Sequence, residues 1–94
     1  MSRTSVYQSR IRTDSADSNA LILLAGGELV AILVALDDEI HGENRHKWTI
    51  ETIFGIGHKR APDTFGSAAD AAAWVSEHIC HLPFLFGDPI PQLG

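Results

Sequence analysis

The chain has 94 residues, enough for one domain with its own hydrophobic core. An apolar fraction of 45% and a charged fraction of 20% are typical of globular proteins and exclude disorder of the whole chain. The net charge of −5 disfavours binding to the phosphate backbone of nucleic acids. Because the single cysteine, Cys80, cannot form an internal disulfide, a reduced, cytoplasmic location is expected.

The N-terminal residues are rich in Ser, Thr, Arg and Asp and contain few large apolar side chains. This composition predicts a flexible N-terminal arm over residues 1–19, which ends in a turn-prone stretch of Asp, Ser, Ala and Asn. A short edge strand over residues 6–12 is the alternative.

Residues 20–36 are apolar or glycine apart from Glu28. The run is shorter than the roughly 20 residues of a transmembrane helix and has acidic flanks, so insertion in a membrane is not expected. We predict two strands, residues 20–25 and 28–36, joined in a tight hairpin by Gly26 and Gly27, since glycine supplies the positive φ that such a turn needs. A helix over residues 28–40 also fits the apolar spacing, but β-branched side chains favour the strand.

A third strand is predicted over residues 46–56, after an acidic connection that contains Gly42 and Asn44. Its side chains alternate: one face carries Trp48, Ile50, Thr52 and Phe54, and the other face is mostly polar.

A helix is predicted to begin at Ser67, which can cap it together with Asp70. The helix ends before Pro83, because the residue preceding a proline avoids helical backbone angles. Apolar residues recur at helical spacing along it: Ala68, Ala71, Ala72, Val75, Ile79 and Leu82.

Together these elements predict an α+β fold: a three-stranded antiparallel sheet, with a fourth strand as an alternative, and one C-terminal helix packed on one face. The β-β-β-α domain spans residues 20–82. The strand over residues 28–36 is apolar on both faces, so both faces of the sheet need a cover. The helix covers one; the C-terminal segment, an N-terminal strand or a second subunit must cover the other. A homodimer and a self-covered monomer are therefore expected about equally.

The last residues, 83–94, are Pro-rich but strongly apolar, so we expect this segment to dock on the chain itself or on a partner. Aromatic residues dominate the energetics of protein interfaces. The candidate interface residues are Trp48, Trp74, Phe84, Leu85 and Phe86.

No constellation of side chains indicates catalysis, and neither enzymatic activity nor a cofactor is expected. The favoured function is association, as a homo-oligomer or as an accessory protein-binding module. One alternative is nucleic-acid binding by basic residues of the arm and of a loop: Arg3, Arg10, Arg12, Lys59 and Arg60. The other is metal binding by His78 and His81, three residues apart on the predicted helix, although no further ligand has suitable spacing.

Overall fold

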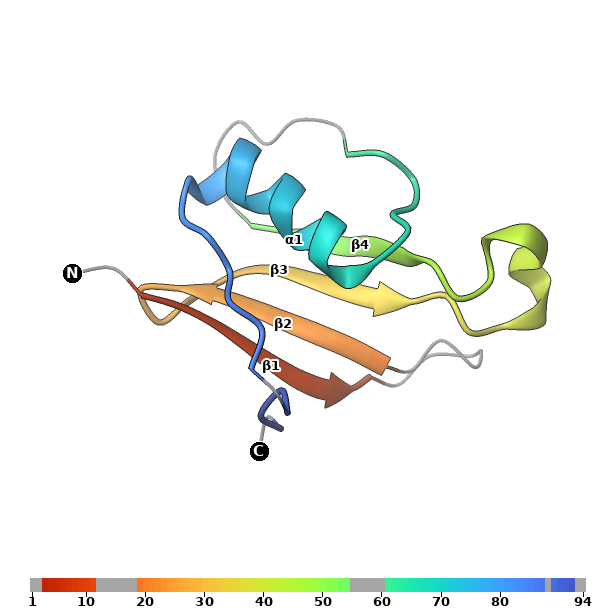
Figure 1. Ribbon diagram of the computed structural model, residues 1–94, viewed down its shortest axis with the longest axis horizontal. Coiled ribbons are helices and arrows are strands. Elements are labelled where there is room, and N and C mark those ends of the chain that lie inside the picture. Colours follow the sequence, from red (N-terminus) through yellow and green to blue (C-terminus); the bar gives the residue numbers. More distant parts are fainter. Residues whose placement is uncertain (1–2, 12–18, 55–60, 88, 93–94) are drawn as a thin grey trace.

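The computed structural model describes residues 3–11, 19–54, 61–87 and 89–92. Its strands β1 (Thr4–Arg10), β2 (Asn19–Ala25), β3 (Glu28–Ala35) and β4 (Trp48–Ile53) form one antiparallel sheet in the order β1-β2-β3-β4. Helix α1 (Ala68–Val75) follows and continues as a π-helical turn, η2 (Ser76–Cys80). In Figure 1 the sheet is seen from the side on which α1 lies. The predicted α+β fold is confirmed, with the alternative fourth strand present.

The β2–β3 hairpin turns at Gly26 and Gly27, whose φ angles are 62° and 80°. Positive φ at both central residues matches the right-handed twist of the two strands. β3 is a strand throughout residues 28–35, so the alternative helix is not formed. A short 3-10 segment, η1 (Glu39–Asn44), makes the connection to β4 and bends at Gly42, where φ is 56°.

Strand β1 corrects the prediction of a flexible arm for residues 4–10. Each of its residues pairs with β2, from Thr4 opposite Ala25 to Arg10 opposite Asn19. The pairing places Val6 in the helix-side core, the cluster of buried residues between the sheet and α1, where it is 4% exposed. One buried valine and a full backbone ladder therefore order a stretch whose composition is typical of a tail. Arg12 and the rest of the arm up to residue 18 lie outside the described residues.

Two irregularities in strand register correct the predicted sheet faces. Leu23 pairs with Ala31 but Leu24 pairs with Leu29, so β3 holds an extra residue, and Val30 joins the helix-side core. β4 holds another: Leu33 pairs with Ile50, whereas its neighbour Ile32 pairs with Thr52. Thr52 therefore does not share a face with Trp48 and Ile50, as strict alternation had predicted.

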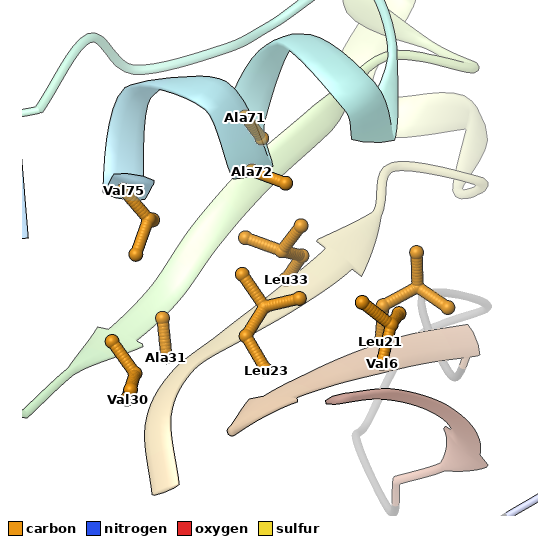
Figure 2. Packing of buried hydrophobic residues seen from close by; sticks show 9 residues of the cluster. All are labelled: Val6, Leu21, Leu23, Val30, Ala31, Leu33, Ala71, Ala72 and Val75. Carbon is orange, nitrogen blue, oxygen red and sulfur yellow. The ribbon is translucent and has the colours of Figure 1, made fainter. Parts of the chain in front are cut away.

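Helix α1 packs on β3 and β4. Figure 2 shows Ala71, Ala72 and Val75 of the helix above buried side chains of β1, β2 and β3. Its N-cap is the predicted one, since the Ser67 hydroxyl accepts a hydrogen bond of 3.1 Å from the Asp70 amide. Alanines at the contact allow the helix to approach the sheet closely. The buried helix-side core comprises Val6, Leu21, Leu23, Val30, Ala31, Leu33, Ala71, Ala72 and Val75.

The turn after α1 ends the helix before Pro83, as predicted. The His81 amide donates to the Ser76 carbonyl at 2.8 Å, five residues back, and His81 takes the left-handed φ of 57°. No helix in the described residues is long and apolar enough to span a membrane.

The C-terminal segment lies on the same side of the sheet as α1, where it crosses β2 and β1 (Figure 1). Phe84, Phe86 and Ile90 pack against the helix-side core. The Thr4 hydroxyl donates to the Pro83 carbonyl at 2.6 Å, and the Gln8 amide donates to the Pro91 carbonyl at 2.8 Å. Helix and segment thus share one face, and the segment also borders the outer edge of β1.

Candidate interaction surface

The face of the sheet opposite α1 has a small apolar centre. Ala20, Ile22 and Val34 are 1%, 9% and 3% exposed, and Tyr7, Ile11, Leu24 and Ile32 pack around them. The C-terminal segment lies on the other side and does not reach this face, whereas the N-terminal strand β1 contributes Tyr7 to its rim from within the sheet. The central side chains are nevertheless shielded within one chain. Burial by a second subunit would remove little more of their area from water.

Much more apolar area is exposed on the C-terminal segment. Between Leu82 and Gly87 its side chains alternate: Leu82, Phe84 and Phe86 are half-buried, whereas Pro83, Leu85 and Gly87 are exposed. Leu85 is 79% exposed. An extended chain directs successive side chains to opposite sides, so anchoring the two phenylalanines in the core turns Leu85 outward.

A groove runs between this segment and the helix, with a volume of about 310 Å³. The side chains of α1 and its last turn that line it are short except for Glu77, and the opposite wall is aromatic and apolar. The groove residues are Ala69, Ala72, Ala73, Ser76, Glu77, Pro83, Phe84 and Phe86.

A second hollow of about 340 Å³ lies between the same segment and the start of β1. Arg3 and Leu85 both line it, together with Thr4, Leu82 and Pro83. Leu85 therefore stands beside Arg3 and on the same short segment as the wall of the groove. We refer to the groove, Leu85 and Arg3 together as the strap surface.

The other predicted interface residues are engaged in the fold. Trp48, Trp74, Phe84 and Phe86 are half-buried and pack against the helix-side core. The Trp74 ring also lies against His78, with ring centroids 4.6 Å apart. Leu85 alone of the five has most of its side chain free for a partner.

The two histidines of the metal hypothesis differ in their surroundings. His78 lies in η2 against Trp74, whereas His81 follows the last turn with a left-handed backbone. In the part of the chain that the structure describes, no three His, Cys, Asp or Glu side chains gather as metal ligands would.

The basic residues of the nucleic-acid hypothesis are not brought together where they are described. Arg3 precedes β1 and Arg10 ends it, so their backbones are separated by roughly 23 Å of extended chain at about 3.3 Å per residue. Arg12, Lys59 and Arg60 lie outside the described residues.

The sequence did not indicate the groove or Glu77 in its lining, and it indicated Arg3 only as a nucleic-acid contact and not as a neighbour of Leu85. The groove forms between a helix and a segment without regular structure, so no spacing in the sequence indicates it. Leu85 was among the predicted interface residues, as part of the apolar run with Phe84 and Phe86 in a Pro-rich stretch.

Comparisons of the chain with protein-family models, with curated proteins and with solved structures gave no match. A proposal for function therefore depends on the geometry of the molecule itself.

Proposed function

We propose that this protein acts by association, as a homodimer, through the strap surface. The observation that carries the proposal is Leu85, a large apolar side chain that is 79% exposed beside an apolar groove. A single exposed leucine is ordinary on a protein surface. A leucine between two core-anchored phenylalanines, with an apolar groove next to it, instead forms a contiguous apolar surface of the kind that marks interaction sites.

The energetics predict a weak dimer. Full burial of one leucine side chain contributes about 1.5–3 kcal/mol, so two related leucines contribute roughly 3–6 kcal/mol. Loss of translational and rotational freedom costs at least about 4 kcal/mol. The leucines alone only offset that cost, and the groove walls must supply the remainder. Association is therefore expected to depend on protein concentration.

The net charge of −5 makes long-range repulsion between copies a further opposing term. Salt screens that repulsion, with a Debye length of about 8 Å at physiological ionic strength. A dimer held by apolar burial should therefore persist or strengthen when the salt concentration rises.

The test is sedimentation equilibrium of the full chain from about 1 μM to about 1 mM, a range that brackets weak to moderate dissociation constants. The proposal expects the average mass to rise from one chain toward two. A mass of one chain over the whole range would refute homodimerisation.

A further inference from the structure

We infer that the dimer is a two-fold pair in which Leu85 of each copy enters the groove of the other and Arg3 of each copy faces the other's Glu77. This inference rests on the proposed homodimer and specifies its contacts. Each copy carries the projecting Leu85, the groove, and the charged residues Arg3 and Glu77. The surface therefore carries both sides of each proposed contact, as a two-fold interface requires.

The order of these features across the strap surface sets the geometry. Arg3 and Leu85 line the hollow on the β1 side of the segment, and the groove lies on its helix side with Glu77 in its lining. A two-fold axis that passes between Leu85 and the groove brings each Leu85 over the partner's groove. The same rotation carries Arg3, which lines the same hollow as Leu85, to the groove side of the partner, where Glu77 lies.

The charges are complementary across this axis. Glu77 is the charged residue in the lining of the groove, and Arg3 is the charged residue beside Leu85. Both side chains are exposed, and neither forms a hydrogen bond or an ion pair within the described residues. Pairing Arg3 of one copy with Glu77 of the other brings opposite charges together, whereas an orientation that placed the two Glu77 side chains together would be repulsive. The charges would therefore set the register of the two copies.

The helix wall permits close approach. Ala69 and Ala73 are exposed and have no side chain beyond Cβ, so they leave room for a leucine between helix and segment. A larger side chain at position 73 would fill that room without entering the core.

The first test is Leu85→Asp, measured by sedimentation equilibrium on the full chain. Leu85 is exposed, so the variant should keep its fold, and circular dichroism checks that it does. We expect the dissociation constant to rise at least about tenfold, because a carboxylate would enter an apolar groove beside Glu77. The matched control is Ile40→Asp, whose side chain is equally exposed, at 82%, but lies in η1 away from the strap surface. This control should dimerise as the unmodified chain does.

The second test is reversal of the charges. Arg3→Glu and Glu77→Arg should each weaken the dimer by about two- to tenfold, and the double variant should recover most of the affinity. Ala73→Leu should also weaken it, by filling the groove.

The outcomes separate the inference from the proposal on which it rests. If the unmodified chain dimerises but Leu85→Asp dimerises equally well, the dimer exists and these contacts are wrong. If the two charge reversals are additive instead of compensating, the Arg3–Glu77 pairing is wrong. If the unmodified chain stays monomeric throughout, both the homodimer and its contacts are refuted.

Discussion

At the scale of single residues, a few positions set the local conformation. Gly26 and Gly27 hold the positive φ angles of the hairpin turn, and nothing lies within 4 Å of a Cβ placed at either. At these two positions the φ angle of the backbone, and not a lack of room for a side chain, favours glycine. Ser67 likewise acts through one hydrogen bond, from the Asp70 amide, at the start of α1.

Gly27→Ala should destabilise the protein by about 1–2 kcal/mol, because an L-residue at a φ of 80° brings its Cβ toward the carbonyl oxygen. Urea unfolding measures the change. Gly66→Ala is the matched control: its φ is not left-handed, and the added Cβ would meet only an Asp70 carboxylate oxygen at 3.8 Å. An equal loss in both variants would contradict the role of φ.

Ser67→Ala should lower the free energy of unfolding by about 0.5–2 kcal/mol, since one amide of the first turn of α1 loses its acceptor. Ser67→Asn keeps a side-chain acceptor and should lie within a few tenths of a kcal/mol of the unmodified chain. Thermal unfolding of both variants distinguishes loss of the cap from a general effect of substitution at this site.

At the scale of elements, strand pairing and helix packing decide which side chains are buried. The two register shifts move Val30 to the helix side and Thr52 away from it, although the sequence alternation alone indicates the reverse. The position of a bulge depends on twist and packing across several strands, so it cannot be predicted from the sequence of one strand alone. The helix, in contrast, buries the alanine and valine stripe that its spacing predicts.

Ala72 and Ala73 are adjacent on α1 but differ in burial, since Ala72 is 2% exposed and Ala73 is exposed. Ala72→Leu should destabilise the fold by about 1–3 kcal/mol, because the added atoms would push α1 away from the sheet. Ala73→Leu should change stability by no more than about 0.5 kcal/mol. Similar losses in urea unfolding would show that α1 does not pack as described.

At the scale of the whole molecule, the C-terminal segment completes the core. α1 lies over β3 and β4, and the segment covers the β1 and β2 part of the same face through Phe84, Phe86 and Ile90. The overall extents of 42 × 30 × 21 Å fit two layers, at about 10 Å for each. The segment therefore belongs to the helix layer and does not form a third one.

Deletion of residues 84–94 should lower both stability and dimer affinity, because the segment supplies core cover and Leu85 together. Single substitutions separate these two roles. Phe86→Ala should lower stability by about 1–3 kcal/mol, less than the about 3–5 kcal/mol of a fully buried phenylalanine. Leu85→Ala should leave stability within about 0.5 kcal/mol and weaken the dimer. Unchanged stability after the deletion would contradict the packing of this segment.

By itself, the sequence determined the hairpin at Gly26 and Gly27, the strand character of β3, and the start and end of α1. Each depends on neighbours within a few residues: glycine at positive φ, β-branched side chains, a serine cap and a proline stop. Only the tertiary structure decided that residues 4–10 form a strand, where the bulges fall, and which apolar residues of the C-terminal segment are buried. These outcomes depend on contacts between residues far apart in the chain, such as Gln8 with Gln92, and local preference does not specify such contacts. The groove beside Leu85 belongs to the same class, since its two walls meet only in the folded molecule.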